Sequence, residues 1–301
     1  MHDIDQLKIN FEQDQLFLLN VCLAFIMFGI SLDLTKDDFL RLVKNPKPAI
    51  IGLTSQLILL PILTFLITRL WDMPPSVAMG LVMVASCPGG NISNFAVHLG
   101  RGNTALSISL TSFVTLIAII VTPVTFSFWT SMIPGTEPLM AGIELNPISM
   151  LKTIAQLILI PLICGMAIRQ YFPRLAAKIR KPINTISLLI FTAFILVALY
   201  ENIPQLKSHL SLVFWLVLIH NGLALIMGYQ WARAWKLPVA DRKAISMETG
   251  IQNSGLGLIL IFNFFEGLGG MMLVAAWWGI WDMISSLLIA LYWRYKSRND
   301  T

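Results

Sequence analysis

The sequence predicts an all-α polytopic membrane protein, and three observations lead to this prediction. Hydrophobic residues make up 56% of the 301 residues and charged residues only 12%, whereas about a quarter of the residues of soluble proteins are charged. Apolar runs of about 20 residues, the length of a membrane-spanning helix, recur along the whole chain. Glycines and small polar residues interrupt two of these runs. We therefore expect residues 1–301 to form a single integral membrane domain.

Nine segments are apolar enough and long enough to cross a bilayer. The longest polar interval, at about 129–149, contains Glu137 and Glu144 and is predicted to be an external loop with a short surface helix. The nine segments lie at roughly 16–34, 48–68, 75–99, 104–128, 150–170, 183–200, 210–232, 244–265 and 271–293.

Lysines and arginines fall unevenly on the two sides of these segments. One set of loops, together with the C-terminal tail, holds 17 of them, and the other side holds only Lys8, Arg69, Lys152 and Lys207. Basic residues collect on the cytoplasmic side of membrane proteins. We therefore expect a multi-pass protein of the plasma membrane, or of the inner membrane in a bacterium, with the N-terminus outside and the C-terminus in the cytoplasm.

Charge and cysteine content exclude several other classes. The net charge of +5 is spread over short loops rather than one face, so nucleic-acid binding is not expected. Cys22, Cys87 and Cys164 all lie in apolar segments and show no disulfide pattern or metal-ligand spacing. The acidic first fifteen residues do not form a secretory signal. The expected partners are the lipid bilayer and a small-molecule substrate, without an obligate protein partner.

Two polar stretches interrupt the third and eighth segments, Cys87-Pro88-Gly89-Gly90-Asn91-Ile92-Ser93-Asn94 and Glu248-Thr249-Gly250-Ile251-Gln252-Asn253-Ser254-Gly255. Broken helices survive in a membrane only where protein or a water-filled cavity shields their free backbone groups. Two of them in corresponding halves of a chain indicate the central binding site of a secondary transporter. Segments three and eight cross the membrane in opposite senses, as an inverted repeat would require, although direct similarity between them is slight.

Glu248 lies within the eighth segment, where a carboxylate needs a cavity or a partner. No basic residue of the membrane interior is an obvious partner, so a hard metal cation such as sodium would supply the opposite charge. Polar oxygens are available from several segments: Gln56, Ser93, Asn94, Ser107, Thr111 and Gln252. The alternatives are that Glu248 is wetted at the cytoplasmic end of its helix, and that each polar side chain only hydrogen-bonds a neighbouring helix.

Three motifs together resemble the bile acid/sodium symporter family. They are CPGG-x-x-SN at 87–94, G-x3-LS-x3-T at 102–111 and ET-G-x-QNSGL at 248–256, and the resemblance extends over nearly the whole chain. It implies nine spans, with two discontinuous helices that cross. It also implies a core domain at approximately 48–128 and 210–293 beside a panel domain at approximately 16–34 and 150–200.

The same resemblance implies two sodium sites. One would be formed by Ser93, Asn94, Ser107, Thr111 and Glu248. The other would be formed by Gln56, Gln252 and Glu248, with the backbone carbonyls of Thr249 and Ile251. Every side chain that these sites require is present in this sequence.

Substrate contacts are expected at Asn253, Asp282 and Met283, and here the sequence departs from the family pattern. Trp281-Asp282-Met283 stands where family members commonly carry a neutral glutamine or a His-Asn pair. Asp282 would either select substrates and sense protons, or be a hydrogen-bonded packing residue. An ionised Asp282 would disfavour a carboxylate substrate, which makes a bile acid itself an insecure choice.

The preferred function is sodium-coupled symport of an organic anion or a bile-acid-like small metabolite by alternating access. The alternative is a sodium-independent exporter of metalloids or organic solutes that uses Cys87 as a ligand. An intramembrane enzyme would need a nucleophile-base pair or a metal triad, and the sequence offers neither, so no catalytic residue is predicted. A receptor without transport is the remaining class.

Overall fold

A computed structural model describes residues 3–8, 13–32, 34–141, 147–201, 207 and 209–299, and in these ranges the regular structure is helical throughout. Two isolated β-bridges, Lys8 with Leu268 and Gly89 with Gln252, are the exceptions. The helices are α1 (Asp3–Gln6), α2 (Gln13–Ser31), α3 (Lys36–Lys44), α4 (Pro46–Thr54), η1 (Ser55–Leu59), α5 (Leu60–Leu70), α6 (Pro75–Ser86), α7 (Asn91–Leu99), α8 (Thr104–Thr130), α9 (Glu137–Ala141), α10 (Pro147–Ile154), η2 (Ala155–Leu159), α11 (Ile160–Tyr171), α12 (Pro173–Glu201), α14 (Leu210–Ala234), α15 (Val239–Gly250), α16 (Ser254–Phe264) and α17 (Gly269–Asn299).

Five continuous stretches among the described residues are long and apolar enough to cross a membrane: Pro46–Leu70, Thr104–Thr130, Leu151–Tyr171, Leu210–Ala234 and Gly269–Ser297. Phe17–Gly29, Pro75–Ser86 and Ser254–Phe264 are shorter apolar helices. The predicted third and eighth spans are each two helices, α6 with α7 and α15 with α16. This is why neither of them meets the length of a single spanning helix.

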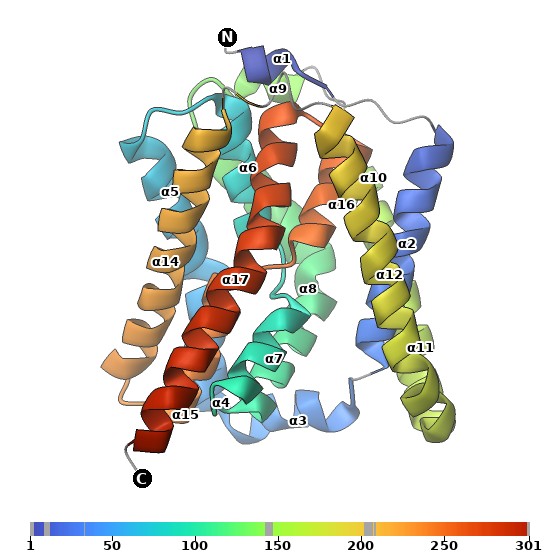
Figure 1. Cartoon of the computed structure of the whole chain (residues 1–301), viewed down its shortest axis with the longest axis vertical. Coiled ribbons are helices and arrows are strands. Elements are labelled where there is room, and N and C mark those ends of the chain that lie inside the picture. The colour runs from blue at the N-terminus through green and yellow to red at the C-terminus, as the bar shows by residue number, and fades with distance from the viewer. Residues whose placement is uncertain are drawn as a thin grey trace.

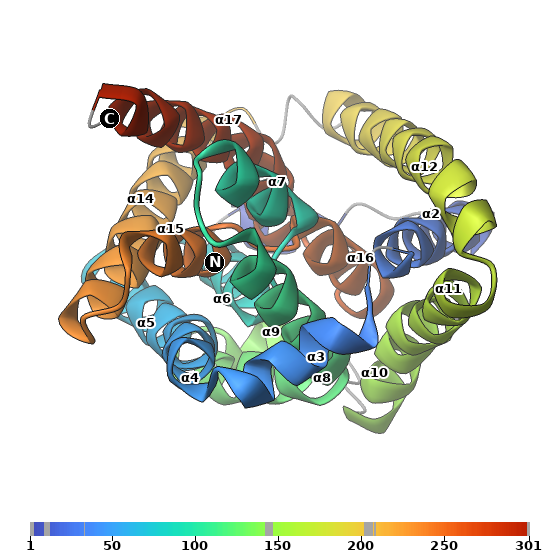
Figure 2. The same ribbon diagram turned by 90° about the horizontal axis from the view of Figure 1, so that it is seen from below.

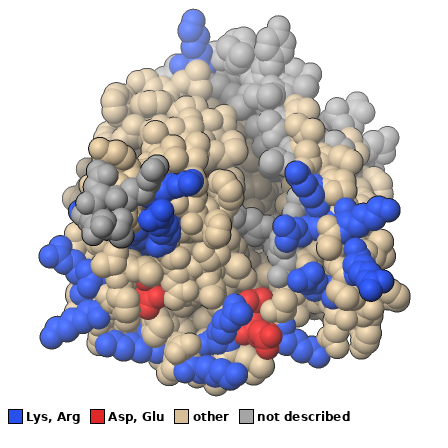
Figure 3. All heavy atoms as spheres, turned by 60° about the horizontal axis from the view of Figure 1, so that its bottom comes forward, with Lys and Arg blue, Asp and Glu red and all other residues tan. Residues whose placement is uncertain are grey.

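The helices form two groups (Figures 1 and 2). In one group α2 packs on both α11 and α12. The other group contains α4 to α8 and α14 to α17, and it meets the first group where α2 contacts α16 and where α8 contacts α10 and η2. α1 and the end of α17 lie at opposite ends of the molecule in Figure 1. Figure 3 shows lysines and arginines gathered over the end at which α17 finishes.

Two π-helical turns interrupt the stretches Pro46–Leu70 and Pro147–Tyr171, and both turns occur at the same sequence pattern. Gln56-Leu57-Ile58-Leu59-Leu60-Pro61 and Gln156-Leu157-Ile158-Leu159-Ile160-Pro161 share this pattern, and the turns η1 and η2 lie just before each proline. A proline has no N–H to donate within a helix, so the turn that precedes it must rearrange. The η1 turn carries Gln56 into the protein interior, whereas Gln156 is exposed.

Backbones approach closely at the centre of the larger group. Every residue of α6 from Ser76 to Ser86 is buried. A Cβ atom at Gly80 would lie 2.9 Å from the Cα of Met271, so only glycine lets α6 lie this close to α17. Small residues at helix contacts are typical of membrane proteins, in which association depends on close packing.

The segment that carries α1 joins the starts of two of these helices. Asp5 Oδ1 accepts a hydrogen bond from the Ser76 N–H at the start of α6, over 2.9 Å. The Leu7 carbonyl accepts one from the Gly269 N–H at the start of α17, over 2.7 Å. These bonds satisfy N–H groups that a helix start leaves without partners.

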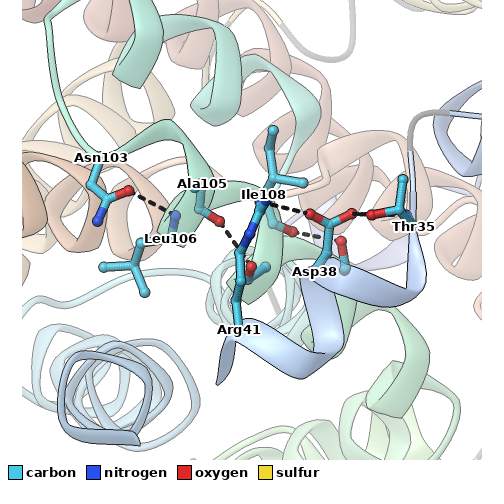
Figure 4. A network of polar contacts seen from close by, with 9 residues as sticks. Thr35, Asp38, Arg41, Asn103, Ala105, Leu106 and Ile108 are labelled. Atoms are coloured by element: carbon cyan, nitrogen blue, oxygen red, sulfur yellow. Dashed lines mark hydrogen bonds and ion pairs between the residues drawn. The ribbon is translucent and has the colours of Figure 1, made fainter. Parts of the chain in front are cut away.

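The helix α3 was not predicted, because its stretch was taken as a basic loop. It starts with a capping box, in which Asp38 Oδ2 accepts from the Thr35 N–H over 2.8 Å and from the Thr35 hydroxyl over 2.7 Å (Figure 4). Arg41 donates to Asp38 Oδ1 over 3.2 Å. α3 packs on α8 at the basic end of the molecule.

Candidate functional site

The two breaks meet in the middle of the molecule. Cys87–Gly90 separates α6 from α7, and Ile251–Asn253 separates α15 from α16. The Asn253 N–H donates to the Pro88 carbonyl over 2.8 Å, and the Gly90 N–H donates to the Ile251 carbonyl over 3.3 Å. Each break therefore supplies partners for the other, as backbone groups in a membrane interior require.

The first break has local causes in its sequence. Pro88 cannot donate a hydrogen bond and pushes the preceding residue out of the helical region, and Cys87 is extended at φ −77° and ψ 157°. The glycines that follow leave room for the second break. A Cβ atom at Gly90 would lie 3.2 Å from the Gln252 carbonyl oxygen, and one at Gly89 would lie 2.9 Å from Glu248 Oε2.

Glu248 lies in the last turn of α15 and is fully buried. Its Oε1 accepts hydrogen bonds from Ser93 on α7 and Ser107 on α8, both over 2.5 Å. Its Oε2 accepts one from Thr111 on α8 over 2.7 Å. The two ion pairs found among the described residues join Lys8 to Glu266 and Arg41 to Asp38, so neither involves Glu248.

Asn94 completes this group. Its Oδ1 lies 2.7 Å from the Ser107 hydroxyl and 3.4 Å from the Thr111 hydroxyl, where it competes with Glu248 for the one proton of each. The start of α8 is attached to α15 by Asn103, whose Nδ2 donates to Asp241 over 2.7 Å. Asn103 Oδ1 caps α8, because it accepts from the Leu106 N–H over 3.0 Å (Figure 4). This attachment fixes the start of α8, which carries Ser107 and Thr111, relative to α15, which carries Glu248. The five side chains predicted for the first sodium ion thus lie together.

The residues predicted for the second ion lie near the same carboxylate. Gln56 Nε2 donates to Gln252 Oε1 over 3.5 Å, and Gln252 Nε2 donates to the carbonyls of Glu248 and Thr249 over 3.1 and 3.0 Å. Gln56 Oε1 is buried without a hydrogen-bond partner. The space beside Gly89 brings Glu248 Oε2, Gln56 Nε2 and the Ile251 carbonyl within 3.7 Å of one point.

This donor set suits a hard cation. A single carboxylate, hydroxyls, amide oxygens and backbone carbonyls are the ligands that such ions prefer, whereas softer metals select thiolates and imidazoles. Among the described residues, no three His, Cys, Asp or Glu side chains cluster as metal ligands. The unpartnered Gln56 Oε1 is the kind of oxygen that a bound cation would satisfy.

The three predicted substrate contacts have different surroundings. Asn253 caps α16, because its Oδ1 accepts from the Leu256 N–H over 3.0 Å. Asp282 is 3% exposed, and Met283 beside it is 44% exposed. Asp282 Oδ2 accepts from the Gln252 N–H over 3.0 Å, and Oδ1 accepts from Asn221 Nδ2 over 3.1 Å.

Other polar contacts support the site. His220 Nε2 pairs with Thr64 over 2.7 Å, and Asn221 Nδ2 donates to the Gly250 carbonyl over 2.9 Å, so both side chains bond across helices. Ser55 pairs with Thr249 over 2.7 Å, a contact that was not predicted. Ser55 is a polar residue directly before Gln56 in an apolar run, and this position could have indicated a contact with another helix.

A second contact that was not predicted joins the two groups of helices. Asn20 on α2 and Asn263 on α16 form a reciprocal amide pair, with distances of 3.1 and 2.8 Å. Each is an amide within an apolar stretch of its helix, and such a residue commonly indicates an interhelical bond in a membrane protein. Cys87, in contrast, is 2% exposed and belongs to the apolar core, where its Sγ would lie 3.6 Å from a Cβ at Gly257.

Comparison with known proteins identifies the family. The profile of the Sodium Bile acid symporter family matches residues 20–209, well over half of the chain. The chain belongs to the sodium bile acid symporter family. It is 32% identical over 278 residues to the uncharacterized sodium-dependent transporter YocS of Bacillus subtilis, covering 92% of this chain and 83% of that protein.

Plant members of the sodium bile acid symporter family are also similar. The probable sodium/metabolite cotransporter BASS1 of Arabidopsis thaliana is 30% identical over 249 residues, covering 81% of this chain and 59% of that protein. BASS2 of Oryza sativa is 29% identical, covering 82% and 57%. The chain thus spans about three-fifths of the length of these chloroplastic relatives. The predicted family is confirmed, and the chain is a multi-pass membrane transporter of a sodium-coupled family rather than an enzyme.

Proposed function

We propose that this protein is a symporter that couples the entry of sodium to the entry of an organic anion or a bile-acid-like small metabolite. The observation that carries the proposal is the environment of Glu248. This fully buried carboxylate receives three hydroxyl hydrogen bonds and has no basic side chain as an ion-pair partner among the described residues. A charge in the membrane interior needs compensation, and a transported cation would provide it.

Two sodium ions are proposed, one on each side of the Glu248 carboxylate. The first would take its oxygens from Ser93, Asn94, Ser107 and Thr111, and the second from Gln56, Gln252 and the carbonyls of Thr249 and Ile251. The contacts of Ser107 and Thr111 with both Asn94 and Glu248 support this partition. The buried, unpartnered Gln56 Oε1 supports the second site.

Sodium would couple to the substrate through the crossing of the breaks. Glu248 stands on α15, whereas Ser93 stands on α7, so an ion held by both would tie the two broken helices together. A substrate that binds the tied form would bind more tightly in sodium, and sodium would bind more tightly with the substrate by the same factor.

An anionic substrate agrees with the direction of the helices at the crossing. α7 begins at Asn91 and α16 begins at Ser254, so both helices point their N-termini toward it. Helix N-termini favour negative charge, and half-helices in transporters direct them at anionic groups. Both oxygens of Asp282 are engaged by Gln252 and Asn221, so this side chain is held at the second break.

We further propose nine crossings arranged as an inverted repeat, with the N-terminus outside and the C-terminus in the cytoplasm of a plasma membrane or a bacterial inner membrane. The basic end in Figure 3 and the opposite positions of α1 and the end of α17 support this orientation. The core would be approximately 48–128 and 210–293, and the panel approximately 16–34 and 150–200. Their relative movement would expose the substrate site to each side in turn.

Uptake into proteoliposomes tests the proposal. Purified protein is reconstituted, and uptake of a labelled bile acid and a series of mono- and dicarboxylates is compared under inward sodium and inward potassium gradients. We expect uptake of at least one anion only with sodium, and its loss in Glu248→Ala and Gln252→Ala protein that still inserts into the membrane. Full transport by both variants with unchanged sodium dependence would refute the proposed ion sites.

A further inference from the structure

Asp282 and Asn221 together hold the backbone of the second break from outside the broken helix. Asn221 Nδ2 donates to the Gly250 carbonyl over 2.9 Å and to Asp282 Oδ1 over 3.1 Å. Asp282 Oδ2 accepts from the Gln252 N–H over 3.0 Å. The four residues form a closed chain of contacts in which a side chain of α14 and a side chain of α17 hold both ends of a three-residue backbone segment.

These contacts fall where the break needs them. The last carbonyls of α15 have no partners within their own helix, and the Gln252 N–H lies beyond the end of that helix. Asn221 satisfies the Gly250 carbonyl, and Asp282 satisfies the Gln252 N–H. Between them, the Ile251 carbonyl accepts from Gly90 of the other break over 3.3 Å.

The supporting side chains are themselves fixed. Asn221 and Asp282 are 0% and 3% exposed. The neighbouring His220 ties α14 to α5 through Thr64 over 2.7 Å, and its ring packs edge-on against Trp278 of α17 with 4.8 Å between centroids. Neither Asn221 nor Asp282 can therefore follow the break freely if it shifts.

We infer that Asp282, with Asn221, is a positioning residue for the second sodium ion rather than a contact of the substrate. The inference rests on the proposed function, in which Gln252 and the Ile251 carbonyl are ligands of that ion. Asp282 accepts from the backbone N–H of Gln252, and the side chain of Gln252 contacts Gln56. Partners behind a metal ligand orient it, and their loss typically lowers metal affinity roughly 10- to 100-fold.

A carboxylate is required at residue 282 for a simple reason. The Gln252 N–H and the Asn221 amide donate to different oxygens of Asp282, and a carboxylate accepts with both oxygens. An asparagine offers one acceptor and one donor, so one of its two ends would confront an N–H group. Asp282→Asn therefore removes the clamp while it changes the side-chain volume very little.

The test is a sodium titration of the purified full-length protein in potassium-balanced buffer, read as the rise in Tm with sodium chloride. Asp282→Asn and Asn221→Ala should each raise the half-saturating sodium concentration by roughly tenfold or more. Because both act on the same break, the double variant should show less than the product of the two single effects. Ser286→Ala is the matched control, since this buried hydroxyl one turn further along α17 bonds only the Met283 carbonyl, over 3.2 Å.

Wild-type sodium affinity in Asp282→Asn, with altered uptake of only some anions, would overturn the inference and make Asp282 a substrate contact. A lower Tm without sodium and an unchanged half-saturating concentration would also overturn it, because that result describes a purely structural role. If Asp282→Asn does not fold, Asn221→Ala decides by the same readout. Absence of a sodium-specific rise in Tm in the wild-type protein would refute the proposed function itself.

Discussion

The backbone of Gly89 lies directly against the carboxylate of Glu248: a Cβ atom added to this glycine would stand 2.9 Å from Oε2 and 3.2 Å from Gln56 Nε2. Gly89, in the first break, thus lines the proposed second ion site, most of whose ligands come from the second break. Gly89→Ala should place a methyl group in this site and raise the half-saturating sodium concentration at least tenfold, with an overpacking cost of about 1–3 kcal/mol. The measurement is sodium-dependent thermal stabilisation.

Gly222→Ala is the control for this substitution. Gly222 lies inside α14, and a Cβ atom there would meet nothing within 4 Å. Alanine favours a helix over glycine by about 1 kcal/mol, so this variant should be as stable as the wild type or slightly more so. Equal sodium affinity in Gly89→Ala and Gly222→Ala would show that no ion occupies the space beside Gly89.

The hydroxyls around Glu248 should contribute to sodium affinity. Ser107→Ala and Thr111→Val each remove a hydroxyl oxygen that is proposed as a ligand of the first ion, and polar contacts with a charged group contribute about 1.5–3 kcal/mol. We expect an increase of roughly 10- to 100-fold in the sodium concentration for half-maximal uptake. Ser112→Ala should leave it unchanged, because this buried hydroxyl bonds only the Ile108 carbonyl of its own helix, over 2.5 Å. A Ser112→Ala effect as large as that of Thr111→Val would mean that loss of packing, not of an ion ligand, is being measured.

The Asn20–Asn263 pair should separate during transport, since it joins α2 of the proposed panel to α16 of the proposed core. Cysteines at both positions, in a background without Cys22, Cys87 and Cys164, can be joined by a short bis-methanethiosulfonate, which forms a reducible disulfide with each thiol and releases methanesulfinate. Cross-linking should stop sodium-driven uptake, and reduction should restore it. Each single cysteine treated in the same way is the control. Continued transport by the fully cross-linked protein would exclude movement of these two helices against each other.

Cys87 should be dispensable for sodium-driven uptake. Its thiol packs in the apolar core near Gly257 and is not among the hydrogen-bond partners of Glu248. Cys87→Ser should therefore retain sodium-dependent uptake, with at most a loss of about 1–3 kcal/mol in stability from a buried hydroxyl. Loss of transport together with an unchanged sodium-dependent rise in Tm would favour a carrier that uses the thiol as a ligand.

The sequence was most informative where polar or helix-breaking residues occur inside apolar, membrane-length segments. Pro88 with its glycines and Glu248 with Gln252 are out of place in apolar helices, and both predicted breaks lie where helices end in the structure. The four-residue spacing of Ser107 and Thr111 placed both hydroxyls on one helix face, and both reach the same carboxylate. The family motifs added the partition into two ion sites, which stays a prediction.

Other features depend on contacts that no local pattern encodes. α17 has apolar residues around its whole circumference, so its sequence does not show whether Asp282 faces the substrate path or the second break. The Asn20–Asn263 pair joins residues 243 positions apart. The helix α3 was readable from Thr35 and Asp38, a capping box, but its charged residues resemble those of a cytoplasmic loop.

The most direct test of the account is a sodium titration of Glu248→Gln, a variant that keeps the side-chain shape and removes the charge. The wild-type protein should gain thermal stability with sodium chloride and not with potassium chloride. Glu248→Gln should show no such gain and no sodium-driven uptake, while its Tm in potassium stays equal to or above that of the wild type, because an uncompensated buried charge has been removed. A sodium-dependent rise in Tm with the wild-type midpoint in Glu248→Gln would contradict the account.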